Sequence, residues 1–119
     1  MPHSDSFKER LYPLLPELQN HFGTPFHIYD EAGIKRTGDD LNKAFSGVRN
    51  FREYYAVKAL PNPAILKIMT ELGFGFDCSS ITELILSRQI GAQTDDLMFT
   101  SNNTSPEEFA VAAAAGGCI

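Results

Sequence analysis

The chain has 119 residues, of which 43% are hydrophobic and 21% charged, a composition typical of one soluble globular domain and not of a disordered segment. It has no apolar run near the ~18 residues that a membrane span needs, and its first residues lack the basic-then-apolar order of a signal peptide. The net charge is −5 and the basic residues are scattered, which excludes the basic stripe of a nucleic-acid-binding surface. We therefore expect a cytoplasmic protein without a membrane or nucleic-acid partner.

The cysteines and histidines are too few and too far apart to suggest a disulfide framework or a metal site. Cys78 lies at a predicted strand end and is either a small buried hydrophobic residue or a functional thiol. We assign no catalytic role to the histidines, because all of them precede the regular alternation of strands and helices. The residues concerned are Cys78, Cys118, His3, His21 and His27.

The beginning of the chain predicts helices and one short strand. Residues 7–22 carry apolar side chains at helical spacing, but Pro13 and Pro16 interrupt the pattern, so we expect a short or broken helix. Residues 26–29 follow a Gly-Thr-Pro turn and are typical of a short strand. Asp30 is a suitable N-cap for the next helix. The apolar face predicted for that helix consists of Ile34, Leu41, Ala44, Phe45 and Val48.

From about residue 50, predicted strands alternate with predicted helices at a period of roughly 20 residues. Asn62, Ser80 and Ser105 are typical N-cap residues, and each of the two serines precedes a glutamate by three positions, as in a capping box. The alternation predicts parallel strands joined by right-handed helical crossovers, in either a barrel or an open doubly wound sheet. The predicted strands span residues 52–58, 74–78 and 97–100, and a fourth begins at Cys118 and Ile119.

Three strand–helix units are too few to close a barrel. A complete eight-stranded barrel needs about 250 residues, and three units with the start of a fourth leave open strand edges. We therefore expect these 119 residues to be an incomplete part of a longer polypeptide.

Lys58 ends the first predicted strand and is the leading candidate for chemistry. Because a strand alternates its faces, Tyr54, Ala56 and Lys58 share one side, and in a barrel Lys58 points inward at the C-terminal end, where barrel active sites lie. Ala56 leaves room for a bound ring, and a desolvated lysine is a usable amine nucleophile. The alternative is a lysine that leaves the strand end for solvent.

Further polar residues follow the next two predicted strands. Asp77 lies at the same rim as Lys58, where it either pairs with the lysine or orients a cofactor, or prepares the start of the following helix. Glu83 is expected to complete a capping box with Ser80, which is compatible with a place near the site. Asn102 and Asn103 offer amide groups at the rim, but asparagine is also a common turn residue.

Three motifs in order resemble the fold-type III pyridoxal-phosphate decarboxylases, the group of diaminopimelate and ornithine decarboxylases. Residues 55–60 (YAVKAL) are similar to the family's YAVKAN lysine motif. Residues 75–80 (GFDCSS) with the following TEL resemble the next strand and helix, especially those of ornithine decarboxylase. Residues 99–108 (FTSNNTSPEE) are similar to the GNNKSPEEL-like segment of diaminopimelate decarboxylases. The resemblance begins near residue 23, but Leu60 replaces the usual asparagine and Thr104 a frequent lysine, which leaves the substrate open.

The resemblance implies a fold and a set of roles. The fold is the N-terminal part of an alanine-racemase-like (β/α)8 barrel of the TIM type, with residues 1–48 leading into the barrel and residues 49–119 forming its first β/α units. Lys58 corresponds to the lysine that binds pyridoxal phosphate as a Schiff base, Ala56 and Asp77 lie beside the cofactor, and Asp77 and Glu83 assist catalysis. No metal is implied.

The same resemblance implies a homodimeric enzyme that decarboxylates a basic or diamino amino acid, in lysine or polyamine biosynthesis. The family's phosphate-binding glycine loop, ring-stacking histidine and acidic partner of the pyridine nitrogen come later in the sequence, so the 119 residues alone are expected to be inactive. An amino-acid racemase on the same barrel, or a non-catalytic cofactor-binding or regulatory relative, is the alternative.

Overall fold

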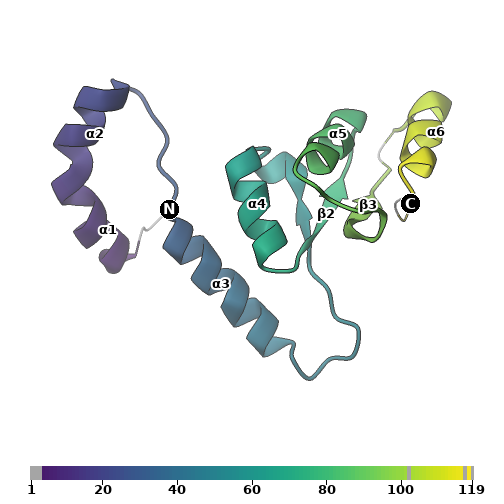
Figure 1. Ribbon diagram of the computed structural model, residues 1–119, viewed down its shortest axis with the longest axis horizontal. Helices are drawn as coiled ribbons and strands as arrows, with labels where there is room; N and C mark the ends of the chain where they lie inside the picture. The colour runs from purple at the N-terminus through teal and green to yellow at the C-terminus, as the bar shows by residue number, and fades with distance from the viewer. Residues whose placement is uncertain (1–3, 102, 117, 119) are drawn as a thin grey trace.

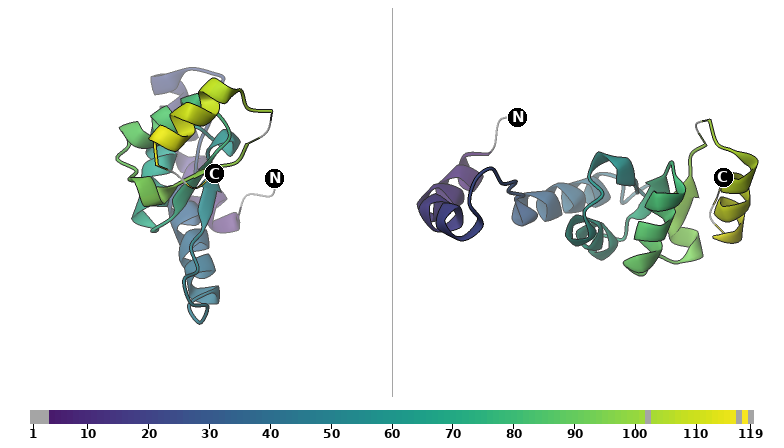
Figure 2. Two further views of the ribbon diagram at one scale, coloured as in Figure 1. Left: turned by 90° about the vertical axis from the view of Figure 1, so that its right-hand side faces the viewer. Right: turned by 90° about the horizontal axis from the view of Figure 1, so that it is seen from above.

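The computed structural model describes residues 4–101, 103–116 and 118. Helical segments at the N-terminus lie at one end of an elongated molecule, and the strand–helix units lie at the other (Figure 1; Figure 2). The radius of gyration is 17.2 Å, whereas a compact chain of this length has about 13.5 Å. The N-terminal segments are α1 (Asp5–Leu11), the 3₁₀ turn η1 (Tyr12–Leu14), α2 (Leu15–Phe22) and α3 (Glu31–Ala44).

Three short parallel strands form a sheet in the order β1-β2-β3. The strands are β1 (Tyr54–Ala56), β2 (Gly75–Cys78) and β3 (Leu97–Phe99). Ala56 pairs with Asp77, Asp77 with Met98, and Met98 forms a further parallel bridge with Cys118. This bridge agrees with the predicted start of a fourth strand at Cys118, and Ile119 lies outside the described residues.

A helix follows each strand, and each starts at the predicted cap. The helices are α4 (Pro63–Glu71), α5 (Ile81–Gln89) and α6 (Pro106–Ala114). The side chains of Asn62, Ser80 and Ser105 accept hydrogen bonds from backbone N–H groups in the first turns. Because all pairing is parallel and every connection contains a helix, this part has the strand–helix rhythm of an α/β barrel.

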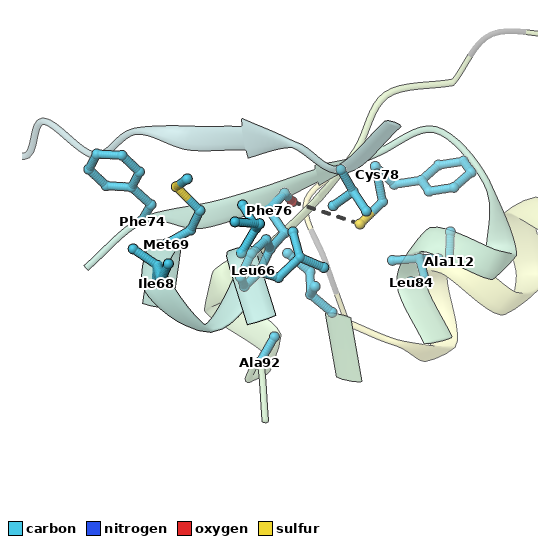
Figure 3. Close-up of a cluster of buried hydrophobic side chains, with 13 residues drawn as sticks. Leu66, Ile68, Met69, Phe74, Phe76, Cys78, Leu84, Ala92 and Ala112 are labelled. Atoms are coloured by element: carbon cyan, nitrogen blue, oxygen red, sulfur yellow. Dashed lines mark hydrogen bonds between the residues drawn. The ribbon is translucent and has the colours of Figure 1, made fainter. Parts of the chain in front are cut away.

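The hydrophobic core lies between one face of the sheet and the helices, as Figure 3 shows. Phe76 and Cys78 of β2 point toward this core, and Gly75 and Asp77 alternate to the other face. That other face, which would line the inside of a barrel, is less covered: Tyr54, Ala56, Asp77 and Met98 are only half-buried. The core consists of Val57, Ile65, Leu66, Ile68, Met69, Phe74, Phe76, Cys78, Leu84, Ala92, Leu97, Phe99 and Ala112.

Helix α3 packs closely on α4 through a glycine. A Cβ atom at Gly38 would collide with the Leu72 side chain, so the contact between the two helices requires glycine at this position. Asn42 Nδ2 also donates to the carbonyl oxygen of Leu72 at 2.9 Å. Ile34 and Leu41 pack against the core, as predicted from the apolar face of this helix.

Some local predictions are wrong. Residues 26–29 form no strand, because a strand needs a neighbour for its hydrogen bonds and the sheet of the described part contains only β1 to β3. The strand predicted at 52–58 is confined to Tyr54–Ala56, and Lys58 lies in the following 3₁₀ turn η2 (Val57–Ala59). Beyond the end of α3, Phe45 and Val48 remain exposed instead of joining the core.

Asp30 starts α3, but its side chain does not form the predicted capping hydrogen bond. Its Oδ1 instead accepts a hydrogen bond from Arg10 Nη2 at 2.7 Å, because α1 brings the guanidinium beside it. This contact ties the N-terminal helical segment to α3. None of the described helices has the length and hydropathy of a membrane span.

Candidate active-site rim

The C-terminal ends of the three strands bring Lys58, Asp77 and Thr100 to one edge of the sheet. Lys58 lies two residues beyond Ala56, which pairs with Asp77. Thr100 lies two residues beyond Met98, which pairs with Asp77 from the other side. In parallel α/β folds this edge is where ligands bind. The expectation that Lys58 and Asp77 share a rim agrees with this register.

The Lys58 side chain is exposed and ends in a free amine. Among the described residues it forms no hydrogen bond and no ion pair, including none with Asp77. Val57 before it is fully buried and anchors the turn in the core. No described element covers the inner face of the sheet above Lys58, so desolvation of its amine inside a closed barrel stays a prediction.

Asp77 is held by the neighbouring strand. Thr100 Oγ1 donates a hydrogen bond to Asp77 Oδ1 at 2.5 Å, and the Thr100 backbone N–H donates to the Cys78 carbonyl oxygen at 2.9 Å. The carboxylate therefore stands half-exposed at the rim with its second oxygen free of hydrogen bonds among the described residues. Thr100 stands in the third sequence motif, but no role was predicted for it, because the motif does not show that its hydroxyl faces Asp77.

Glu83 fixes the loop between β2 and α5. Its backbone N–H donates to Ser80 Oγ at 3.3 Å, as predicted. Its carboxylate accepts from the Ser79 N–H at 3.0 Å and from Ser80 Oγ at 3.0 Å, so it reaches one residue earlier than a regular capping box does. The complete box forms at Ser105 and Glu108 instead. Both Glu83 carboxylate oxygens thus accept hydrogen bonds within the loop that follows Asp77 and β2.

Cys78 is a core residue and not a rim thiol. Its side chain is fully buried among the core residues (Figure 3). The Cys78 Sγ lies 3.6 Å from Ser87 Oγ. Burial raises the pKa of the Cys78 thiol to about 11. Because the thiolate is the reactive form of cysteine, this thiol is inert near neutral pH. The interpretation of Cys78 as a small buried hydrophobic residue is confirmed.

The loop after β3 is a turn of small polar residues. Asn103 has a φ of 62°, in the left-handed region where asparagine is well tolerated. Ser101 Oγ donates to Thr104 Oγ1 at 3.0 Å. Asn103 thus fits the expectation of a turn residue, and Asn102 lies outside the described residues.

A second polar cluster lies at the opposite edge of the sheet. Arg52 Nη2 lies 2.5 Å from Asp96 Oδ1, and Arg52 Nη1 donates to the Asp95 carbonyl oxygen at 2.8 Å. Tyr54 Oη donates to the same carbonyl at 3.2 Å. In barrels this edge serves stability. No sequence signal reveals the cluster, because its partners lie 44 positions apart.

An apolar cavity lies away from the rim. It has a volume of about 520 Å³ and lies between α1, α3 and α4. Apolar side chains such as Phe7, Ile34, Tyr55 and Phe74 line it, and none of the three rim residues does. Its lining contains no lysine or cysteine side chain.

Comparison with known proteins places this architecture in a family. The family described as pyridoxal-dependent decarboxylase, pyridoxal binding domain, matches residues 31–117. The chain belongs to this family. Its fold is thus the N-terminal part of a pyridoxal-phosphate-binding α/β barrel, and the doubly wound alternative no longer stands.

Individual relatives extend over most or all of the chain. It is 52% identical over all 119 residues to Protein TabA of Pseudomonas amygdali pv. tabaci, covering 28% of that protein. It is 35% identical over 101 residues to diaminopimelate decarboxylase of Methanothermobacter thermautotrophicus, covering 84% of the chain and 24% of that protein. The crystal structure of lysine/ornithine decarboxylase from Vibrio vulnificus superposes with a TM-score of 0.79 at 25% identity, over 88% of this chain and 28% of that one. The chain thus spans about a quarter of the length of these relatives.

The rim residues fit pyridoxal phosphate. The cofactor needs a primary amine that is free to react, and Lys58 Nζ has no partner among the described residues. The neighbouring inward position on β1 is the small Ala56, which leaves space beside the amine. When bound, pyridoxal phosphate supplies an electron sink for the bond that breaks in the substrate.

Proposed function

We propose that the protein containing this chain decarboxylates a basic or diamino amino acid with pyridoxal phosphate. The observation that carries the proposal is the free Lys58 amine at the C-terminal strand edge, beside Asp77, in a chain that belongs to the pyridoxal-dependent decarboxylases. The relatives named diaminopimelate decarboxylase and lysine/ornithine decarboxylase support this class of substrate.

Each rim residue has a proposed task. Lys58 holds the cofactor through its amine, and Ala56 leaves room for the ring. Asp77 orients a cationic group at the rim through the carboxylate oxygen that Thr100 leaves free. Glu83 assists by keeping the loop after β2 in place, since its two oxygens bind Ser79 and Ser80.

The charge of the rim favours a substrate with a second amine. Asp77 and Glu83 place two carboxylates next to the strand ends, and the described ion pairs include neither of them. Ornithine, lysine and diaminopimelate all carry an amine beyond the α-amine. Leu60 and Thr104 differ from the usual residues of the family motifs, so the motifs do not select one of these three substrates.

The 119 residues of this chain alone are proposed to be inactive. They supply three strands of the eight that close a barrel, and no described element covers the inner face. Positioning and an ordered electrostatic surrounding supply much of an enzyme's barrier reduction, and both need a closed site.

We also propose that the whole protein is a homodimer with active sites shared between its subunits. Sedimentation equilibrium measures this oligomeric state.

The test is release of CO2 by the protein containing this chain, loaded with pyridoxal phosphate. Diaminopimelate, ornithine, lysine and arginine are offered separately. We expect one of them to turn over near the enzymatic median of about 10 per second, and Lys58→Ala to abolish turnover. Lys67→Ala, a change at an exposed lysine on α4, is the matched control. Full turnover by Lys58→Ala, or none of the four substrates reacting, would contradict the proposal.

A further inference from the structure

Thr100 joins the ends of two neighbouring strands by two different hydrogen bonds. Its backbone N–H donates to the Cys78 carbonyl oxygen at 2.9 Å, which extends the pairing of β2 and β3 beyond Phe99. Its hydroxyl Oγ1 donates to Asp77 Oδ1 at 2.5 Å. The first bond fixes the backbone of Thr100, so the second can fix the side chain of Asp77.

The hydrogen bond leaves one carboxylate oxygen available. Asp77 Oδ2 has no hydrogen-bond partner among the described residues, and the pair is exposed at the rim. Lys58, in the turn that follows the neighbouring strand β1, forms no ion pair with Asp77. Among the described residues no cation pairs with this oxygen, so it is free to accept a hydrogen bond from a ligand cation, and a basic amino acid carries one.

An exposed carboxylate needs such a support to bind in one orientation. Holding a free side chain in a single rotamer costs conformational entropy, and a hydrogen bond to a charged oxygen is about twice as strong as one between neutral groups. The hydrogen bond from the Thr100 hydroxyl orders the Asp77 side chain before the ligand binds. Ligand binding then orders fewer groups and is stronger.

We propose that Thr100 is a positioning residue that acts through Asp77, holding Oδ1 so that Oδ2 meets the ammonium group of the substrate. The identity of that ammonium rests on the proposed function. Thr100 itself touches neither substrate nor cofactor. Its removal therefore weakens substrate binding only while the Asp77 carboxylate is present.

The kinetic test combines Thr100→Val, which keeps the shape and removes the donor, with Asp77→Ala in the cofactor-loaded protein. Thr100→Val raises KM five- to tenfold with kcat within a factor of two. Asp77→Ala lowers kcat/KM at least tenfold, and adding Thr100→Val to it changes nothing further. Thr100→Ser keeps the donor and restores KM to within twofold. Thr70→Val, which removes an exposed hydroxyl on α4, is the control. An equal effect of Thr100→Val with and without Asp77 overturns the proposal.

A second measurement separates this inference from the proposed function. Three-bond NMR couplings report the χ1 rotamer of Asp77 in the protein containing this chain, without substrate or cofactor. One rotamer in the wild type and in Thr100→Ser, with averaging in Thr100→Val, supports the positioning role even if the protein decarboxylates nothing. An Asp77 rotamer that is unchanged in Thr100→Val overturns it, whatever the protein catalyses.

Discussion

Arg52 Nη2 lies 2.5 Å from Asp96 Oδ1, and this ion pair joins the chain before β1 to the turn before β3. The other Asp96 oxygen accepts from the Gln93 N–H at 2.6 Å. The Arg52 guanidinium, with that hydrogen bond second, lowers the pKa of Asp96 below its ordinary value of 3.8. The pair thus fastens the two outer strands of the sheet at the edge away from Lys58.

The first prediction concerns the pH dependence of this pair. Asp96→Asn keeps the shape and removes the charge, so we expect a loss of about 0.5–1 kcal/mol in the free energy of unfolding at pH 7. Because the folded-state pKa is lowered, the contribution is complete above the unfolded pKa of about 3.9 and is lost as the pH falls through the folded value. Urea unfolding at pH 7 and pH 3 measures it.

Asp95→Asn is the matched control, because Asp95 takes part in the cluster through its backbone carbonyl oxygen. It should leave the unfolding free energy unchanged at both pH values. A difference between wild type and Asp96→Asn that is as large at pH 3 as at pH 7 would contradict the electrostatic explanation.

The second prediction concerns Gly75, the first residue of β2. A Cβ there would lie 2.5 Å from Tyr54 Cε1 and 2.8 Å from the Asp96 carbonyl oxygen, so the backbone has to shift. We expect Gly75→Ala to destabilise the fold by about 1–3 kcal/mol, as overpacking does elsewhere. A Cβ at Gly47 would meet no atom within 4 Å, so the unfolding free energy of Gly47→Ala should stay within about 0.5 kcal/mol of the wild-type value. Equal stability of the two variants in thermal unfolding would show that β1 and β2 are less closely packed.

The third prediction separates the two roles of Glu83. Glu83→Ala removes the acceptor of the Ser79 N–H, so we expect a loss of about 1 kcal/mol in stability together with slower turnover. Glu108→Ala removes the same kind of contact at the start of α6, from the Ser105 N–H. It should cost similar stability and leave turnover unchanged. If both variants slow turnover equally, Glu83 acts only through stability.

The sequence predicts what depends on neighbouring residues. Asn62, Ser80 and Ser105 start their helices as expected, because a cap is decided within one turn. The parallel pairing of the strands follows from the same alternation, and the lysine motif places Lys58 at the C-terminal edge of the sheet. The strand predicted at residues 26–29 is absent, because a strand depends on a neighbouring strand that the hydrophobic periodicity does not reveal.

The contacts that the sequence does not predict are those between distant positions. Thr100 reaches Asp77 across 23 positions, and Arg52 reaches Asp96 across 44. Both depend on the register of the parallel strands, which a single sequence does not specify. Motifs therefore indicated Asp77 as a candidate, and only the structure shows which residue holds it.

Reduction with borohydride after incubation with pyridoxal phosphate, followed by peptide mass mapping, tests the central claim most directly. The claim is that the Lys58 amine holds the cofactor. We predict that the pyridoxyl group is recovered on Lys58 in the protein containing this chain, that Lys58→Arg removes it, and that Lys67→Arg does not. Recovery of the label mainly on Lys8, Lys35, Lys43 or Lys67, or its persistence in Lys58→Arg, would contradict the account.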